Sequence, residues 1–371
     1  MMSEFRSSKR ACFARDDAPF VSATRACRGV PSLLLRVVCC VSFLLLLLVV
    51  PACGRSEEPA PEARAGSRPW THIDVVERWS FAGGVAEDQD LSALACISDR
   101  FGLVGADESR AVQAVELSRK ARTLRVMQTI PLARSGDEID TEGIAAEGDH
   151  YYIIGSHGIS KKQGEYQGNR FRLFRLTVDP ATGRAGRPVS VETASLADLL
   201  RADPVLGEYF GKPLQQKGVN IEGLAVRDGR LFVGFRGPNL QGDAFVLEVR
   251  AEDVFGGSSQ PSYTLHRLHL GTGLGIREIV AAKSDFLLIV GNSAAEPSEK
   301  FTQSADYDED REFFLCAWDG KSPDAHRIGP IPDVRGKAEA MTILEETDDH
   351  ATVLVLFDGP HQGRPTVYRL Y

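Results

Sequence analysis

The stretch DTEGIA, from Asp140 to Ala145, decides the fold because exact and looser copies of its pattern recur along the chain. The other copies are DLSALA at 90–95, NIEGLA at 220–225, GIREIV at 275–280 and KAEAMT at 337–342. After each copy comes a short polar turn and then a β-rich apolar run that stops at glycine, such as YYIIG at 151–155. Self-similarity at intervals of several tens of residues is typical of a solenoid or a toroidal array.

The remainder of each repeat has the pattern of further strands. Apolar residues alternate with polar ones in FRLFRLTV at 171–178 and in YTLHRLHL at 263–270, as in strands with one buried face. Four-stranded units of this kind protect their edges when they are arranged radially around a channel. The sequence therefore predicts an all-β fold, a β-propeller of five blades with one short helical insertion at 195–210. A degenerate blade between 179 and 219 would make six.

The two ends of the globular body favour closure of this ring. The last repeat finishes on the third-strand pattern TVYRLY at 366–371, so it lacks a fourth strand of its own. The segment HIDVVERWSF at 72–81 can supply that strand from the start of the body. We therefore expect the first and last segments to pair and to close the ring without a covalent bond.

Residues 1–52 have the pattern of a signal peptide. Basic residues from Lys9 to Arg36 precede an apolar run at 37–50, which is long enough for a signal sequence and short for a membrane span. The run leads into VPAC, which is similar to a bacterial lipobox, so we expect Cys53 to carry lipid. Residues 53–69 are rich in Pro, Glu, Ala, Arg and Ser and predict a flexible tether, and 70–371 is the propeller domain.

This leader implies an exported protein that is lipid-anchored in the cell envelope, in the outer membrane or on the periplasmic face. Gly54, which follows Cys53, is not an inner-membrane retention signal of the aspartate type and favours the outer location. Two alternatives stay open, namely ordinary secretion after cleavage and retention of the apolar run as a single-span anchor. We expect a monomer that meets the membrane only through its lipid.

The charge of the chain argues against nucleic acid as a partner. Residues 1–52 hold seven basic and three acidic residues, so the remaining chain holds 36 basic and 48 acidic residues, a net charge of −12. Nucleic-acid binding needs a basic footprint, which this body lacks. Cations and ligands with basic groups are better matched to an acidic surface.

Propeller geometry brings the repeated motifs together at one mouth of the channel. The first strand of each blade lines the channel, and the loop that leaves the second strand lies at the same end. Equivalent inner positions in the five motifs are Ser92, Glu142, Glu222, Arg277 and Glu339. The loops that leave the second strands add Asp107, Glu108, His157, Arg236, Asn292 and Asp358.

Carboxylates crowded in this way favour a cation site. Three such groups repel one another unless a cation, an arginine or raised pKa values compensate. Hard cations such as Ca²⁺ take carboxylate and amide oxygens. The predicted metal ligands are Asp140, Glu142, Asn220, Glu222 and Glu339. The alternative is architectural, because a glutamate after a turn can cap backbone amides or tie one blade to the next.

Basic residues at the same mouth suggest a small or phosphorylated ligand. Guanidinium groups hold phosphate and carboxylate oxygens bidentately. The predicted ligand-binding residues are Arg236, Arg277, Lys161 and Asn292, and His157 can contribute. If a bound metal activates water for ester hydrolysis, the candidate catalytic residues are Glu142, Glu222, His157 and Arg277.

The set DTEGIA, YYIIGSHG, NIEGLA, GFRGP and GLGIREI resembles, in order and spacing, the bacterial domain-of-unknown-function family 3616 over nearly the whole body. The resemblance implies a β-propeller. More distantly, the EGIA and EGLA motifs are similar to those of the esterase-like phytase propellers, which implies a secreted phosphoesterase assisted by Ca²⁺. The fourth repeat departs from this pattern because Arg277 stands where the other repeats have Glu or Ser.

Three functional hypotheses follow. The first is an anchored propeller whose acidic mouth binds a cation and a small ligand. The alternative is a metal-assisted phosphoesterase or esterase-like hydrolase that uses the same mouth. A third hypothesis is a protein-docking scaffold that works through its outer strands.

Overall fold

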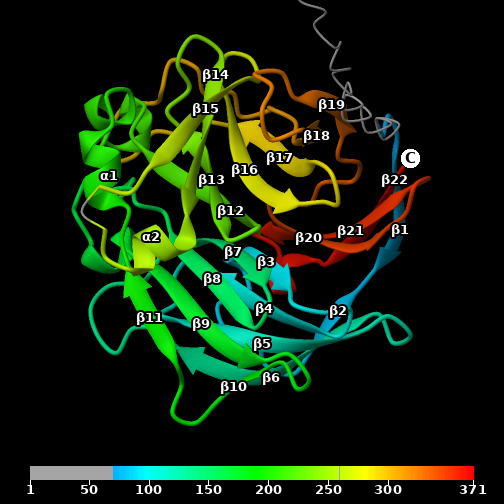
Figure 1. Ribbon diagram of the computed structural model, residues 1–371. Coiled ribbons are helices and arrows are strands. Elements are labelled where there is room, and N and C mark those ends of the chain that lie inside the picture. The colour runs from blue at the N-terminus through cyan, green and yellow to red at the C-terminus, as the bar shows by residue number, and fades with distance from the viewer. Residues whose placement is uncertain (1–69, 259) are drawn as a thin grey trace, which may run out of the picture. The chain divides into compact units, whose positions relative to one another are not determined.

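The computed structural model describes residues 70–258 and 260–371, which form five sheets arranged in a ring (Figure 1). The five inner strands contact one another in a closed circle at the centre. They are β3 (Leu91–Cys96), β7 (Thr141–Glu147), β12 (Asn220–Arg227), β16 (Leu274–Ala281) and β20 (Lys337–Glu346). The fold is therefore the five-bladed β-propeller that the repeats predict.

Each blade continues outward from its inner strand in chain order. The second strands are β4 (Phe101–Ala106), β8 (His150–Gly155), β13 (Arg230–Gly237), β17 (Phe286–Asn292) and β21 (Ala351–Asp358). The third strands are β5 (Ala111–Ser118), β9 (Leu173–Asp179), β14 (Asp243–Arg250), β18 (Phe314–Trp318) and β22 (Thr366–Leu370). The fourth strands of the first four blades are β6 (Thr123–Pro131), β11 (Val191–Ala194), β15 (Tyr263–His269) and β19 (His326–Pro330).

No sixth blade lies within the described residues. The segment considered for it contributes only β10 (Arg184–Ala185) and β11, and both pair with β9 of the second blade. It then forms the helix α1 (Ala197–Ala202) and a short 3₁₀ turn at Leu206–Glu208, which match the predicted helical insertion. The six-blade alternative is wrong because this segment extends an existing sheet and covers its outer side. A second short helix, α2 (Ala251–Phe255), follows β14.

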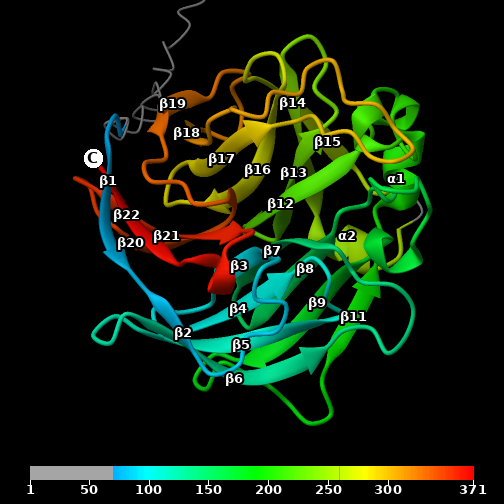
Figure 2. The same ribbon diagram turned by 180° about the vertical axis from the view of Figure 1, so that it is seen from behind.

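The ring closes as predicted. The strand β1 (Ile73–Arg78) pairs antiparallel with β22, and Ile73 lies opposite Leu370. It therefore supplies the outer strand of the fifth blade, as the two views of the ring show (Figure 2). The sequence did not predict that the chain would then continue into β2 (Ser80–Ala82), which pairs parallel with β6 of the first blade. One segment thus bridges the last blade and the first.

Every inner strand carries a β-bulge near its start. The pairing register shifts by one residue between each inner strand and the second strand of its blade. The residues left over by these shifts are Ser92, Glu142, Glu222, Arg277 and Glu339. A bulge re-aims the side chain that it frees. The five positions aligned from sequence are thus structurally equivalent.

The residue after the bulge is small in four of the five blades, and the reason is close approach. A Cβ on Gly143 would lie 2.8 Å from the backbone nitrogen of Leu224, and one on Gly223 would lie 2.8 Å from that of Ile279. Real Cβ atoms do not come so close to a neighbouring backbone. Glycine at these two positions therefore lets neighbouring inner strands meet at the axis.

The hydrophobic core is divided into five clusters, one at each interface between neighbouring blades. Leu103 and Ile153 belong to the cluster between the first and second blades. Ile73 and Leu370 belong to the cluster between the fourth and fifth. Each blade buries its two faces only against its two neighbours. The outer faces of the first and last blades are therefore shielded from water only when the ring is closed.

The closing strand should therefore contribute measurably to stability. We expect Ile73→Ala to lower the free energy of unfolding by about 2 kcal/mol, because it deletes buried methyl groups from the interface between blades. Val76, on the same strand, is 40% exposed, and Val76→Ala should change stability by less than about 0.5 kcal/mol. Urea unfolding followed by circular dichroism measures both, and equal losses in the two variants would contradict this role for β1.

Candidate functional site

The five bulge residues meet at one end of the channel, where the sequence predicted the mouth. All five side chains are buried, and even the long side chain of Arg277 is only 1% exposed. The turn after β4 brings Asp107 to the same place, and the end of β13 brings Arg236. The mouth has two chemically different halves. The third to fifth blades supply an ion-pair network, and the first two supply carboxylates.

Arg277 is the centre of the ion-pair network. Its Nε lies 2.8 Å from Oε2 of Glu222, and its Nη2 pairs with Oε1 of Glu339. Glu222 also forms an ion pair with Arg236, whose Nη1 lies 2.8 Å from Oε1 of Glu222. Asn220 donates to the same oxygen at 3.3 Å. Asn220, Glu222 and Glu339, which were predicted as metal ligands, therefore already have partners within this network.

The two arginines predicted to bind a ligand are largely occupied by this network. Besides its bond to Glu222, Arg236 donates from Nε to the carbonyl of Asn292 at 3.1 Å and from Nη2 to that of Ala294 at 2.8 Å. Both arginines nevertheless line the cavity described below, so their charge remains available to a ligand. Burial acts to raise the pKa of Glu222, but Arg236 and Arg277 outweigh it and the pKa is lowered.

The other half of the mouth holds a cluster of three carboxylates. One oxygen each from Asp107, Asp140 and Glu142 lie within 4.8 Å of one another. Asp140 is balanced by Arg170, whose Nη1 lies 2.9 Å away. Oδ1 of Asp107 and Oε1 of Glu142 are buried without a hydrogen-bond partner. Two of these residues were predicted as metal ligands, whereas Asp107 was placed only among the loops at the mouth.

This crowding disfavours the charged forms of two of the three groups. Burial, followed by repulsion from Glu339 and Asp140, raises the pKa of Asp107 well above its ordinary value. Burial, followed by repulsion from Asp107 and Glu222, does the same to the pKa of Glu142. An unpaired buried carboxylate is costly, and a cation that bound between these groups would remove that cost.

A cavity of about 240 Å³ lies beside the ion-pair network, with Arg236 and Arg277 in its wall. Its basic lining residues are Lys161, Arg236, Arg277, Arg311 and Lys337, and its acidic ones are Glu296 and Glu309. Tyr307 and Phe313 add aromatic surface, and Asn292 lies in the wall. All four predicted ligand-binding residues therefore line one cavity.

Lys161 connects this cavity with the carboxylates. It lines the cavity, and its positive charge favours the ionised forms of Asp107, Glu142 and Glu222. The described residues offer its ammonium group no ion pair within salt-bridge distance. A ligand in the cavity and a cation at the carboxylates would thus share this lysine as a neighbour.

His157 has a structural role, because backbone groups contact both of its ring nitrogens. The ring is fully buried, with Nδ1 2.9 Å from the carbonyl of Gly155 and Nε2 accepting from the backbone N–H of Leu196 at 3.1 Å. Burial lowers its pKa to about 4. Both nitrogens are engaged by backbone, so the structure does not bring His157 together with Glu142, Glu222 and Arg277 as a free general base.

Glu278 is a buried carboxylate at the axis that the sequence interpretation missed. It occupies the position after the bulge, where the other blades have glycine or alanine. Its Oε1 accepts from the backbone N–H groups of Ile279 at 2.8 Å and Leu224 at 3.4 Å. Burial raises its pKa well above the ordinary value. Alignment of GIREIV with NIEGLA would have revealed it, because Glu278 stands where Gly223 does.

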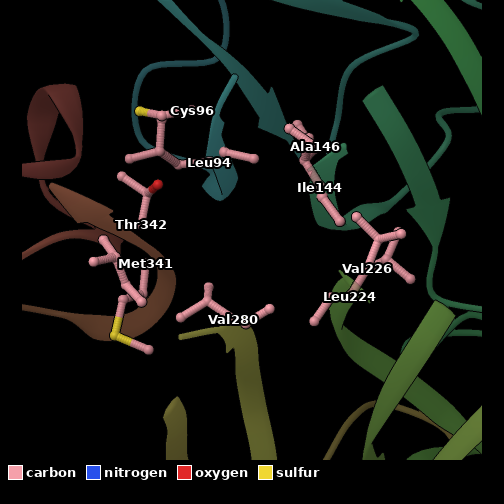
Figure 3. Close-up of a pocket in the computed structure, with 14 residues that line it drawn as sticks. Leu94, Cys96, Ile144, Ala146, Leu224, Val226, Val280, Met341 and Thr342 are labelled. Atoms are coloured by element: carbon pink, nitrogen blue, oxygen red, sulfur yellow. The ribbon is translucent and has the colours of Figure 1, made fainter. Parts of the chain in front are cut away.

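Beyond Glu278 the channel becomes apolar. Side chains from all five inner strands surround a cavity of about 140 Å³, among them Leu94, Ile144, Leu224, Val280 and Met341 (Figure 3). The side chains in this part of the channel are therefore mostly apolar, whereas those at the mouth are mostly charged.

The family model described as Protein of unknown function (DUF3616) matches residues 90–181 and 179–368, which include every inner strand and every bulge residue. The chain belongs to the DUF3616 family. This confirms the family resemblance seen in the motifs. The more distant likeness to phytase propellers stays a prediction. No functionally curated protein matches this DUF3616 chain in sequence.

Solved structures similar to this DUF3616 protein have little sequence in common with it. YCF48 bound to D1 peptide shares 9% identity over 79% of this chain and 65% of that one, with a TM-score of 0.31. A tail fibre of a Staphylococcus aureus phage shares 9% over 81% and 53%, with a TM-score of 0.39. A streptogramin B lyase shares 8% over 82% and 99%, with a TM-score of 0.36. The chain thus spans about two thirds of the first and half of the second, and scores this low carry no argument about function.

The ion-pair network should be a main determinant of stability. We expect Arg277→Met to lower the free energy of unfolding by about 3–5 kcal/mol, because it leaves Glu222 and Glu339 buried with fewer positive partners. Arg100 pairs with Glu116 on the surface and is 64% exposed, so Arg100→Met should cost at most about 1 kcal/mol. Chemical unfolding of both variants tests this, and similar small losses would show that the buried network contributes no more than a surface pair.

The carboxylate cluster should make stability depend on pH. Asp107 and Glu142 have ordinary pKa values of 3.8 and 4.5, and both are raised in the folded protein. The folded state therefore binds more protons above those values, so the free energy of unfolding falls as pH rises. In metal-free buffer, the parent should lose more stability between mildly acidic and mildly alkaline pH than an Asp107→Asn, Glu142→Gln variant. Identical slopes in urea unfolding would rule out this contribution.

Proposed function

We propose that this protein is a binding protein whose channel mouth takes a divalent cation of the Ca²⁺ class together with a small ligand. The observation that carries the proposal is the carboxylate cluster of Asp107, Asp140 and Glu142, in which two buried oxygens have no hydrogen-bond partner. Buried polar atoms are almost always satisfied, so these oxygens suggest a ligand. Carboxylate oxygens are the ligands that Ca²⁺ prefers.

The ligand set proposed here differs from the one expected from sequence. Asp140 and Glu142 are kept and Asp107 joins them. Glu222 and Glu339 are left out of the ligand set because both pair with Arg277. A carboxylate that already has a guanidinium partner attracts a metal ion less strongly. The asymmetry follows from the fourth repeat, where arginine replaces the motif glutamate.

The cavity lined by Arg236 and Arg277 supports a small anionic ligand. Five basic and two acidic residues line it, and its volume of about 240 Å³ suits a small molecule. Lys161 and Arg311 are its basic residues without a carboxylate within hydrogen-bond distance. We propose that they meet a carboxylate or phosphate group of the ligand, while Tyr307 and Phe313 contact its less polar part.

We further propose that the protein is exported and held in the cell envelope by lipid on Cys53. The signal-like run and the lipobox support this, and both lie outside the described residues. Among residues 70–258 and 260–371, no helix has the length and apolar character needed to cross a membrane.

A metal-assisted phosphoesterase is the second candidate function. It is favoured by the position of Lys161, which adjoins both the carboxylate cluster and the cavity. Asp107, Asp140 and Glu142 would hold the metal, which would supply a Lewis acid and an activated water. The basic residues of the cavity would orient the phosphate and offset its charge.

Calorimetric titration of Ca²⁺ into metal-stripped protein tests the cation site. We expect saturable binding that is weakened at least about tenfold by Asp107→Asn with Glu142→Gln, because two of three anionic ligands become neutral. Glu278→Gln is the matched control, since it neutralises a buried carboxylate of the same channel outside the cluster. Absence of binding in the parent, or equal affinity in the double variant, would refute the site.

Turnover separates the two candidate functions once binding is established. Hydrolysis of a phosphomonoester that requires Ca²⁺ and is lost in the double variant would select the enzyme. Affinity for phosphate-bearing ligands without hydrolysis would select the binding protein.

A further inference from the structure

A second cavity with unusual chemistry lies at the outer edge of the fifth blade. Its volume is about 340 Å³, and its lining residues are Arg78, Trp79, Arg335, Arg364, Pro365 and Thr366. They come from the end of β1, the segment before β20 and the loop between β21 and β22. None of them lines the mouth cavity or belongs to the carboxylate cluster.

Positive charge dominates this cavity. Three of its six lining residues are arginines, in a chain whose net charge is −8. Asp333 is the acidic partner of two of them, Arg78 and Arg335. It pairs with Arg78 and accepts from Nε of Arg335 at 2.7 Å. The described residues give the guanidinium of Arg364 neither a hydrogen bond nor an ion pair, so the three arginines have one acidic ion-pair partner among them, Asp333.

Backbone strain is concentrated around the same cavity. Ten non-glycine residues of the described chain have positive φ, and Arg364, at 40°, is one of them and lines the cavity. Asp333, at 54°, pairs with two of the cavity's arginines, and Gln362, at 56°, lies two residues before Arg364. Left-handed backbone is unfavourable for residues with a Cβ, because the Cβ comes too close to the following carbonyl oxygen. Strain of this kind persists where the surrounding structure enforces it and gathers at ligand sites.

Trp79 gives the cavity a rigid wall. Its side chain is largely buried, and its indole N–H donates to Oε2 of Glu77 at 2.8 Å. The backbone N–H of Trp79 also donates to the carbonyl of Pro365 at 2.8 Å, which ties together the two segments that line the cavity. The arginines are thus presented beside a fixed aromatic and proline surface.

We propose that this cavity binds a small ligand that carries a phosphate monoester. Guanidinium groups match the geometry of phosphate oxygens and hold them bidentately. A doubly charged phosphate balances the excess of two positive charges that three arginines leave over Asp333. The volume also leaves room for an organic part of the ligand against Trp79 and Pro365. This site is independent of the cation site at the mouth.

The test is calorimetric titration of the full-length protein with inorganic phosphate and with glycerol 3-phosphate, in metal-free buffer of constant ionic strength. We expect saturable binding that Arg364→Asn weakens at least about tenfold, because a charged hydrogen bond is lost. Asparagine tolerates left-handed backbone, so this variant keeps the loop. Arg134→Gln, which removes an exposed arginine elsewhere, should bind like the parent.

A second substitution tests the sign of the charge argument. Asp333→Asn removes the negative group that competes for Arg78 and Arg335, and asparagine again suits positive φ. Phosphate affinity should rise in this variant. Unchanged or weaker binding in folded Asp333→Asn protein would count against the proposed contacts.

A parallel arm identifies the source of the phosphate. Vesicles of phosphatidylcholine, with or without phosphatidic acid, are floated with parent and Arg364→Asn protein. Binding that needs phosphatidic acid and Arg364 would support the site with a lipid headgroup as its ligand, and binding of glycerol 3-phosphate alone would support a soluble one. The proposal is overturned if neither the titrations nor the vesicle flotation shows saturable binding. It is also overturned if the Arg364→Asn variant binds phosphate as tightly as the parent does, because the phosphate would then be bound at the mouth.

Discussion

The close approach of five inner strands at the propeller axis is the constraint from which the rest of the structure follows. Gly143 and Gly223 have no room for a Cβ, since neighbouring backbone lies in the way. Strands so close cannot direct large side chains inward at every position. A bulge at the start of each strand sends one side chain into the mouth before the strands meet. Packing at the axis and chemistry at the mouth are therefore two results of the same geometry.

The mouth is asymmetric although its framework is repeated five times. A single change in the fourth repeat, arginine for glutamate at position 277, turns the third to fifth blades into a compensated ion-pair network. The first two blades have no such partner for Glu142 and Asp107, and their carboxylates are left to repel one another. Charge that is balanced within the protein stabilises the ring, whereas charge that is left unbalanced can attract a ligand.

Glu278 shows how one departure from the repeat affects the whole channel. Its carboxylate accepts N–H groups from the third and fourth blades and fills space that small residues leave elsewhere. The apolar cavity beyond it is lined by all five inner strands. A buried acid thus separates a polar mouth from an apolar channel, and its hydrogen bonds to backbone reduce the cost of burying it.

The sequence by itself determined the β-propeller, the number of blades up to one alternative, the closing strand and the equivalence of the five motif positions. It could do so because strand alternation and repeated turns are local patterns, and each repeat gives them again. Only the tertiary structure decided which mouth residues are partners. Glu222 and Arg236 are paired, whereas Asp107, Asp140 and Glu142 are gathered without enough positive charge. Which mouth residues form ion pairs depends on the rotation between neighbouring blades and on the direction in which each bulge turns its side chain. The spacing of the motifs along the sequence predicts neither of these.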